Sequence, residues 1–326
     1  MHKTKTVFFV ITILGPLITM FSNSWISMWM GLEINMMAFI PLIKKKANSA
    51  TAEAAMMYFL VQSVSSSILM FSIIMSFLWE NNEMMMTITF MSLLVKLGAA
   101  PFHMWVPEIM SKMDWNSCIL LMTWQKIAPL SMIMNIKPQE NVLMMTVMMS
   151  TAIGAIGGIN QTSLRKIMAY SSINHLAWMM ITMKTLNNWI MYLVMYSIMT
   201  ATICMTFKKY NMMFINQINS MNLSLVEKIT YMTSMMSLGG LPPFIGFLPK
   251  WMIIQAMMKT EMVVIMMIMV MFSLITLFYY MRTMSFMSMS QASLNKWLVV
   301  KSKSPLILWN ILLNLSLPMS MMINFT

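Results

Sequence analysis

Long hydrophobic stretches alternate with short polar stretches along almost the entire chain. A helix needs roughly 20 mostly apolar residues to cross the hydrocarbon core of a bilayer, and stretches of about this length recur eleven times. They are expected at about 4–22, 25–43, 54–78, 86–106, 113–136, 141–159, 166–183, 187–207, 224–258, 261–281 and 305–325. The pattern therefore predicts an all-α integral membrane protein with about 11 transmembrane helices.

The ninth stretch, 224–258, is too long to be one straight helix. Its middle reads Gly-Gly-Leu-Pro-Pro-Phe at 239–244, and a continuous α-helix cannot pass through this run because proline has no N–H to donate. We expect one broken span here, with the break at Pro242 and Pro243. No soluble domain fits between the helices, since the sizeable polar connections are only 208–223 and 282–304.

The composition supports lipid as the solvent of this chain. Of its 326 residues, 59% are hydrophobic and 9% are charged, and the mean hydropathy is +0.72. A soluble domain carries about 25% charged residues. The apolar run after the first five residues is interpreted as a retained first helix, because no small-residue cleavage site follows it. Cys118 and Cys204 lie in apolar runs without partners at metal-ligand spacing, which disfavours a metal or disulfide role.

The net charge of +12 could indicate a nucleic-acid ligand, but the positions of the basic residues argue against one. With eleven alternating spans, fifteen basic residues fall on the side of the N-terminus and three fall on the other side. Cytoplasmic and matrix loops carry such an excess. We therefore expect the N-terminus on the matrix or cytoplasmic side and no nucleic-acid partner. The fifteen are Lys3, Lys5, Lys44, Lys45, Lys46, Lys112, Arg165, Lys166, Lys208, Lys209, Lys228, Arg282, Lys296, Lys301 and Lys303, against Lys137, Lys184 and Lys259.

A few charged residues remain inside the predicted spans. Glu33 lies eleven residues before Lys44, about 16 Å along a helix and thus near mid-membrane. One such residue could be a buried ion pair or a snorkelling lysine. Each central charge costs at least ~2.5 kcal/mol to insert, and three lysines cannot all pair with one acid. Lysines that switch between charged and neutral forms suit a proton relay. The candidates for proton transfer are Glu33, Lys96, Lys126, Lys250 and, because imidazole can extend a relay, His175.

An internal repeat is centred on the same region. Gly98 is followed by Pro101-Phe102 and then Pro107-Glu108, with the spacing of Gly240, Pro243-Phe244 and Pro249-Lys250. Two glycine–proline turns can also resemble each other by chance. The two sites lie in spans of opposite direction, which favours two inverted five-helix units with broken helices, an arrangement that marks ion pathways in transporters. The expected units are 1–136, 141–281 and a final connection and helix at 282–326, with helix breaks at Pro101, Pro242 and Pro243.

Five motifs together resemble the chain 2 family of mitochondrial NADH:ubiquinone oxidoreductases. They are WMGLEIN at 29–35, KLGAAPFHMWVPE at 96–108, WQKIAP at 124–129, YSSINH at 170–175 and LPPFIGFLPKW at 241–251. The resemblance covers the whole chain in order. Asn174 departs from the small residue expected before the histidine. The 53 methionines are similar to the content of family members from insects and other arthropods.

The resemblance implies an antiporter-like fold without the first three helices of fourteen-helix bacterial relatives. By motif, Glu33 pairs with Lys96 as an electrostatic switch, Lys126 is the central relay, His175 bridges the water chain, and Lys250 leads toward a neighbouring module. The implied location is the mitochondrial inner membrane, with the N-terminus in the matrix. The implied partners are other membrane-arm subunits of a large hetero-oligomeric complex, including antiporter-like neighbours, and lipids such as cardiolipin.

The resemblance places NAD, FMN, iron–sulfur clusters and ubiquinone on other subunits. In agreement with this, neither a GxGxxG motif nor a CxxC cluster occurs in the sequence. A free-standing cation/proton antiporter is the alternative, and the missing helices disfavour it because a partner should cover the surface they leave. A purely structural spacer is a third possibility. The intramembrane lysines oppose it, since a spacer would gain stability by losing them. His103, beside the predicted break at Pro101, has no role assigned by this reasoning.

Overall fold

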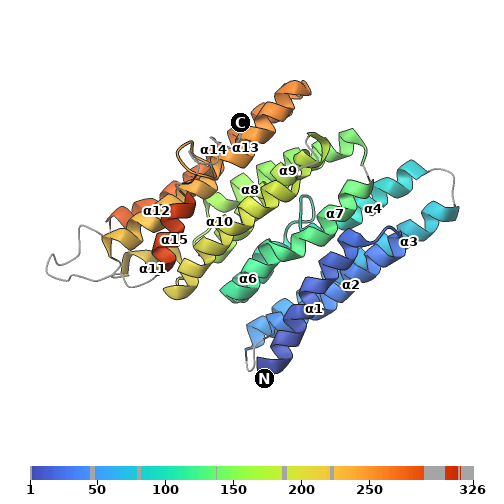
Figure 1. Cartoon of the computed structure of the whole chain (residues 1–326), viewed down its shortest axis with the longest axis horizontal. Helices are drawn as coiled ribbons and strands as arrows, with labels where there is room; N and C mark the ends of the chain where they lie inside the picture. Colours follow the sequence, from blue (N-terminus) through green and yellow to red (C-terminus); the bar gives the residue numbers. More distant parts are fainter. Residues whose placement is uncertain are drawn as a thin grey trace. The chain divides into compact units, whose positions relative to one another are not determined.

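The computed structural model describes residues 2–44, 48–78, 82–136, 138–185, 189–220, 224–289, 305–314 and 316. Within these ranges the regular elements are helices, with one isolated antiparallel β-bridge between Ser163 and Phe214. The chain divides into two compact units, Met1–Ser150 and Thr151–Thr326 (Figure 1). These units are defined by packing, whereas the predicted units 1–136 and 141–281 rest on the repeat and stay a prediction.

The first unit is built around α3, which packs against α2, α4 and α5. Helix α1 lies along α2 and also contacts α7, which in turn contacts α4, and Figure 1 shows α1, α2 and α3 running alongside one another. The helices of this unit are α1 (His2–Phe21), α2 (Trp25–Ile43), α3 (Ser49–Leu78), α4 (Asn82–Leu97), α5 (Trp105–Lys112), α6 (Trp115–Met122), the 3-10 helix η1 (Trp124–Lys126), α7 (Ile127–Ile136) and most of α8 (Glu140–Ile159).

In the second unit α9 packs against α10 and α13, and α12 packs against α10, α14 and α15. The end of α8 belongs to this unit, and its Gly158 lies against the ring of Tyr279 on α14. The helices are α9 (Leu164–Thr185), α10 (Trp189–Lys209), α11 (Ile215–Ser220), α12 (Leu225–Gly239), α13 (Phe247–Lys259), α14 (Val263–Met289) and α15 (Pro305–Asn314).

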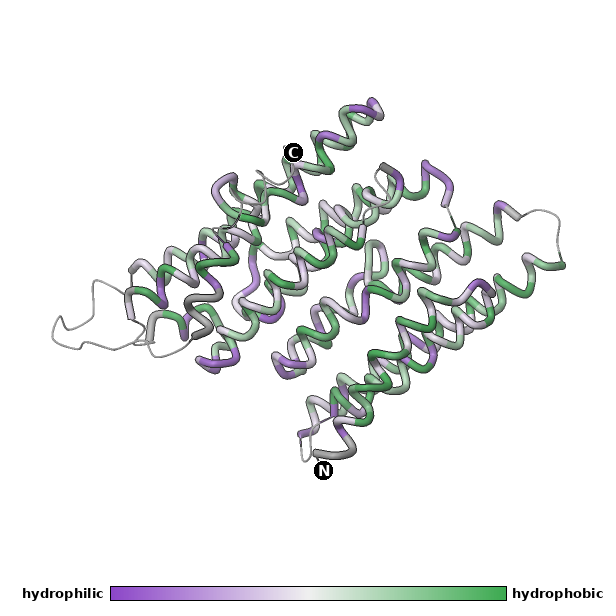
Figure 2. The backbone as a smooth tube through the Cα atoms, viewed as in Figure 1, coloured by the Kyte–Doolittle hydropathy of each residue, from purple (hydrophilic) through white to green (hydrophobic). Residues whose placement is uncertain are grey.

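Six helical stretches in the described residues are long and apolar enough to cross a membrane. They are Trp25–Ile43, Ser49–Leu78, Trp115–Ile136, Glu140–Ile159, Trp189–Lys209 and Val263–Ser288. Figure 2 shows hydrophobic residues along the helices of each unit and hydrophilic residues mainly near helix ends. Large apolar side chains such as Phe71, Val264 and Phe278 are exposed, as lipid-facing residues are. The prediction of an all-helical membrane protein is confirmed.

One predicted boundary was wrong in detail, and one predicted connection is partly helical. Helix α14 continues to Met289, so the start of the predicted connection 282–304 is helical, and 290–304 lie outside the described residues. The connection 208–223 contains the short helix α11. The predicted last span, 305–325, is described only through Asn314 and at Ser316.

The turn between α8 and α9 is held by backbone and side-chain contacts from two other segments. Leu164 donates its N–H to the Met213 carbonyl (2.9 Å), and Ile215 donates to the Thr162 carbonyl (3.0 Å). The Arg282 guanidinium on α14 donates to the carbonyls of Ile159 and Gln161. The carbonyls that helix α8 leaves open at its end therefore have a cationic partner, which stabilises a helix C-terminus.

Candidate functional site

Four lysines are buried in the described part of the chain, and three of them lie beside an interruption of helix. Lys96 is 6% exposed in the last turn of α4, Lys126 is 4% exposed at the end of η1, and Lys250 is 5% exposed in the first turn of α13. The fourth, Lys228, is 1% exposed in α12. Burying lysines is costly unless they are partnered, so the surroundings of each decide what it can do.

Helix α4 ends directly after Lys96 in a left-handed glycine turn. Gly98 has φ 68°, and a Cβ there would overlap the side chain of Val106. Ala99 donates its N–H to the Leu94 carbonyl (3.1 Å) and Gly98 donates to Val95 (3.2 Å), the two bonds of a Schellman motif. Pro101 lies in the non-helical segment that follows, before α5 begins at Trp105.

Glu33 reaches the surroundings of Lys96 from α2. Its carboxylate is close enough to act electrostatically on Lys96 and on the Tyr58 hydroxyl of α3. The Glu33 Oε1 atom is buried, and no protein group among the described residues donates a hydrogen bond to it. No direct ion pair joins Glu33 to Lys96 in that part of the chain. The two charges thus lie near each other with an acceptor oxygen left available.

Lys126 lies at an interruption within 113–136, which the apolar pattern predicts to be one continuous span. Helix α6 ends at Met122, Thr123 follows at φ −113°, ψ −72°, and a 3-10 turn leads into α7. The Lys126 N–H donates to the Thr123 carbonyl (3.3 Å), three residues back instead of four. Pro129 carried the signal, since it has no N–H to give to the carbonyl of Gln125.

Gln125, the residue before Lys126, connects this turn to two other helices. The Tyr58 hydroxyl of α3 donates to Gln125 Oε1 (3.3 Å), and Gln125 Nε2 donates to Asn35 Oδ1 of α2 (3.0 Å). On its other side the turn is bound to α1, because Trp124 Nε1 donates to the Thr12 carbonyl (2.8 Å). Sequence reasoning missed these contacts.

Lys250 reaches back across the second broken helix. Its Nζ donates to the Gly239 carbonyl at the end of α12 (2.8 Å) and lies 5.8 Å from the ring centroid of Trp178 on α9. The ammonium thus sits at the negative end of a helix. Gly240 has φ 79°, and a Cβ there would lie 2.9 Å from Lys250 Cδ. Glycine at this position therefore makes room for the lysine. Pro242 and Pro243 follow in the segment before α13 begins at Phe247.

His175 is buried on α9, one helical turn before Trp178. Its Nδ1 and the Tyr192 hydroxyl of α10 are 2.9 Å apart, and its ring lies 4.8 Å from that of Tyr196. A cavity of about 10 Å³ lies beside Tyr192 and is bounded by α13 at Leu248 and Pro249, directly before Lys250. In the second unit His175 therefore contacts aromatic side chains of α10, and Lys250 lies near the α9 residue Trp178, one helical turn after His175.

Asn174 is buried against Gly154 of α8, where the two helix backbones approach closely. Its Oδ1 atom has no protein hydrogen-bond partner among the described residues. Asparagine in place of a small residue therefore adds a buried polar atom at the residue next to His175, and this atom can still accept a hydrogen bond.

His103 is half-buried, and its Nδ1 lies 3.1 Å from the Pro101 carbonyl within the first break. This short-range contact gives His103 a local role in the turn, and among the described residues no hydrogen bond links it to the buried lysines.

Lys228, the fourth buried lysine, lies in the first turn of α12, beside a polar cluster. Its neighbour Glu227 accepts from the Ser224 N–H in a capping box and pairs with Lys209 (Nζ to Oε1, 3.3 Å). Burial, together with the hydrogen bond to Glu227, raises the pKa of Tyr210 above its usual value. A polar cluster therefore joins the end of α10 to the start of α12.

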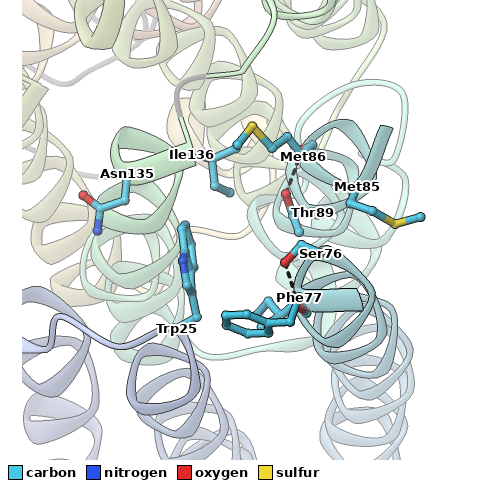
Figure 3. Close-up of a pocket in the computed structure, with 9 residues that line it drawn as sticks. Trp25, Ser76, Phe77, Met85, Met86, Thr89, Asn135 and Ile136 are labelled. Carbon is cyan, nitrogen blue, oxygen red and sulfur yellow. Dashed lines mark hydrogen bonds between the residues drawn. The ribbon is translucent and has the colours of Figure 1, made fainter. Parts of the chain in front are cut away.

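A separate pocket of about 220 Å³ lies in the first unit, away from the lysines (Figure 3). The hydroxyls of Ser76 and Thr89 donate to carbonyls of their own helices, Ile73 and Met86, each at 2.7 Å. The pocket has no charged side chain in its lining and is unsuited to proton transfer. It is lined by Trp25, Ile73, Ser76, Phe77, Met85, Met86, Thr89, Asn135 and Ile136.

Comparison with known proteins gives consistent results. Residues 22–276 match the family described as "NADH:quinone oxidoreductase/Mrp antiporter, TM". The chain is 43% identical over 309 residues to NADH-ubiquinone oxidoreductase chain 2 of Anopheles gambiae, a match that covers 91% of this chain and 89% of that relative.

Two solved structures share the fold at low sequence identity. A chain of respiratory complex I from Thermus thermophilus with bound aureothin superposes with a TM-score of 0.83 at 17% identity, over 95% of this chain and 77% of that one. A chain of the Mrp complex from Dietzia gives 0.76 at 17% identity, over 85% and 59%.

Proposed function

The chain belongs to the NADH-ubiquinone oxidoreductase chain 2 family, and from this premise we propose how its buried residues translocate protons. It is an antiporter-like membrane subunit of a proton-translocating NADH:ubiquinone oxidoreductase. We assign NAD, FMN, the iron–sulfur clusters and ubiquinone to other subunits. The contribution of this chain is then proton transfer through the membrane, driven by redox chemistry elsewhere in the enzyme.

One observation carries the proposal: Lys96, Lys126 and Lys250 are each buried beside an interruption of helix. A charged residue deep in a membrane segment costs at least ~2.5 kcal/mol. Non-helical backbone at that depth exposes N–H and C=O groups, which are tolerated only where protein or water satisfies them. Lysines and free backbone groups at the same positions favour a polar route through otherwise apolar helices.

Each residue has a role in this route. Glu33 and Lys96 form the electrostatic switch, because a carboxylate near an ammonium favours its charged form and separating them favours the neutral form. Lys126 is the central relay. His175, with the Tyr192 hydroxyl at 2.9 Å, extends the route in the second unit. Lys250, held by the Gly239 carbonyl, delivers charge toward a neighbouring module.

The proposed topology is eleven spans with the N-terminus on the matrix side of the mitochondrial inner membrane. The two glycine turns support two inverted five-helix repeats, since α4 and α12 end directly before Gly98 and Gly240, and α5 and α13 begin at the same offset after them. The partners are neighbouring antiporter-like subunits of a hetero-oligomeric complex. Lipids such as cardiolipin cover the exposed apolar side chains.

A free-standing cation/proton antiporter is not favoured, because the chain matches an oxidoreductase subunit over 89% of that relative's length. Isolation in mild detergent distinguishes the two. The chain should travel within a large assembly that oxidises NADH, and isolation of an active single chain would support the antiporter instead.

The central test is Lys126→Met in the assembled, reconstituted enzyme. Methionine keeps the stem volume of lysine, so packing should survive, and losing a buried charge removes a desolvation cost. Moving one proton against 100 mV costs ~2.3 kcal/mol, and the missing titratable group adds a barrier to that. We expect proton pumping to fall at least about tenfold with assembly retained.

Lys259→Met is the matched control, because Lys259 is exposed at the end of α13. It should pump at the normal rate. Normal pumping by a fully assembled Lys126→Met enzyme would remove Lys126 from the route.

A further inference from the structure

The amide of Gln125 joins two polar side chains from two other segments of the first unit. Tyr58 donates to its oxygen (3.3 Å), and its nitrogen donates to Asn35 (3.0 Å). Tyr58 and Asn35 are each 3% exposed. The contacts join positions 67 and 90 residues apart in sequence, so they exist only in the folded unit.

Asn35, at one end of this row of hydrogen bonds, and Gln125, at its centre, are close in sequence to the proposed proton-transfer residues. Asn35 lies two residues after Glu33 on α2, and Gln125 directly precedes Lys126. The Tyr58 hydroxyl is within electrostatic range of the Glu33 carboxylate. Gln62, one helical turn after Tyr58 on α3, donates to the Lys96 carbonyl (3.1 Å). Helix α3 therefore contacts the Glu33–Lys96 site and the Lys126 turn at once.

The amide of Gln125 fixes the direction of donation in this row of hydrogen bonds, from Tyr58 through Gln125 to Asn35. Tyr58 has one O–H, which is used on Gln125, so the Tyr58 oxygen can only accept from other groups. Gln125 accepts on one side and donates on the other. A primary amide does not titrate near neutral pH and passes no proton itself. A change of charge next to Tyr58 acts on the position of the turn that carries Lys126.

We propose that Gln125 is a positioning residue that couples the charge state of Glu33 and Lys96 to the geometry of Lys126. The proposal rests on the proton-transfer function inferred above. It goes beyond that function by naming how the switch and the relay are connected: through the neutral chain Tyr58–Gln125–Asn35 and the 3-10 turn, with no proton moving along it.

The first test is Gln125→Leu in the reconstituted whole enzyme, combined with Tyr58→Phe in a double-mutant cycle. Leucine keeps the approximate size and removes both hydrogen bonds. We expect pumping to fall about tenfold, since small misplacements of a reacting group cost rate. The double variant should be no worse than Gln125→Leu alone, because residues in one network do not add. Additive losses would show that the two side chains act independently and would overturn the proposal.

Trp124→Phe is the matched control, because it breaks the other hydrogen bond that holds the same turn, to Thr12 on α1. It should retain most of the pumping. An equal loss would mean that the turn only needs to be held, and this would contradict a specific role for Gln125.

Gln125→Glu gives a readout that a structural role would not produce. As a neutral acid, glutamic acid can accept from Tyr58 and donate to Asn35, but the ionised form can no longer donate. Of the charged and titratable groups around it, Tyr58 on α3 contacts residue 125 directly, and Lys126 on η1 follows it in sequence. Glu33 on α2 is within electrostatic range of Tyr58 and of Lys96 on α4. In the described residues of α1 beyond Lys5, and of α6 and α7, no side chain is charged.

Pumping by Gln125→Glu should approach the wild-type rate at low pH and fall toward that of Gln125→Leu as pH rises. The wild-type enzyme should lack this added loss. The glutamate variant also keeps the test decisive if the leucine variant does not assemble. A pH dependence identical to that of the wild type would overturn the coupling.

The outcomes separate this inference from the proposed function. Normal pumping by Gln125→Leu together with failure of Lys126→Met would overturn the coupling alone. Normal pumping by Lys126→Met would overturn the relay, and the coupling with it.

Discussion

The two broken helices, α4–α5 and α12–α13, share one backbone design and differ in where they carry the charge. Each first helix ends in a left-handed glycine with the same pair of backbone hydrogen bonds: Leu241 donates to Met236 (3.3 Å) and Gly240 to Ser237 (3.0 Å), as Ala99 and Gly98 do in the first break. In the first break Lys96 lies before the glycine. In the second, Lys250 lies after it.

The partners of the two lysines differ accordingly. Lys96 interacts electrostatically with the carboxylate of Glu33, whereas Lys250 donates a hydrogen bond to the backbone carbonyl of Gly239. The position in the first break that corresponds to Lys250 is Glu108, which is exposed. The same backbone break therefore supplies a polar environment in both places, and the position of the charged residue within it does not depend on the backbone geometry. A switch needs a titratable partner, and a terminal relay can use a fixed dipole.

The glycines should give the largest effects. Gly98→Ala imposes a left-handed conformation costing roughly 1–2 kcal/mol, and its Cβ overlaps Val106, so we expect a loss of about 3 kcal/mol in total. Gly240→Ala meets the flexible end of Lys250 and should cost about half as much. The amount of assembled enzyme and its dissociation temperature measure both. Equal losses would contradict the view that Gly240 mainly makes room for a movable side chain.

The next largest effects on stability should come from substitutions of Lys96 and Lys250, and these two effects should differ. Lys96→Met leaves the Glu33 charge without its nearby cation and should destabilise the assembled enzyme by about 2 kcal/mol. Lys250→Met loses one charged hydrogen bond to a neutral carbonyl and should cost about 1 kcal/mol. Thermal dissociation of the purified enzyme measures both.

A compensating substitution sharpens this result. Glu33→Gln combined with Lys96→Met should recover most of the stability, because the uncompensated charge is gone. The same Glu33→Gln change should not help Lys250→Met. Failure of the first combination to recover stability would show that Glu33 and Lys96 are not energetically linked.

Breaking the ion pair at the exposed end of α5 should have the smallest effect on stability. Lys112 and Glu53 form an ion pair at 2.5 Å, but the Glu53 side chain is 61% exposed. Surface pairs of this kind contribute about 0.5 kcal/mol or less. Glu53→Gln should therefore leave thermal dissociation and pumping within error of the wild type. A large loss would show that this face of the first break is covered by a partner in the assembled enzyme.

The parts of the fold that depend on short stretches of sequence could be predicted. Apolar runs of spanning length indicate membrane helices, and the glycines and prolines around Pro101 and Pro242 mark where helix cannot continue. The family resemblance seen in five motifs is confirmed by the 43% identity to a chain 2 relative and by the family match over residues 22–276. The interruption at Thr123 was missed because its signal, Pro129, lies six residues later inside an apolar run. A proline there is compatible with either a kink or a tolerated break.

The connections between helices could not be predicted, because they depend on tertiary contacts. Nothing in the sequence near Gln125 indicates that its amide meets Asn35, 90 residues away. Tyr192 is one aromatic residue among many in apolar runs, and only the packing of α9 against α10 places its hydroxyl on His175. The proposed roles of Glu33, Lys96, Lys126, His175 and Lys250 stay predictions until the substitutions are made.

The turn between α8 and α9 has a consequence for how this chain can vary in length. A surface connection usually tolerates inserted residues, because its backbone is free to bulge outward. Here Thr162 is in register with Ile215, and Arg282 spans the carbonyls on either side of Asn160. One added residue would break this register and release Arg282 of α14 from the end of α8 and the turn. The turn therefore works as a fixed-length spacer, and a reporter or affinity tag inserted there would uncouple two helices where most loops would only lengthen.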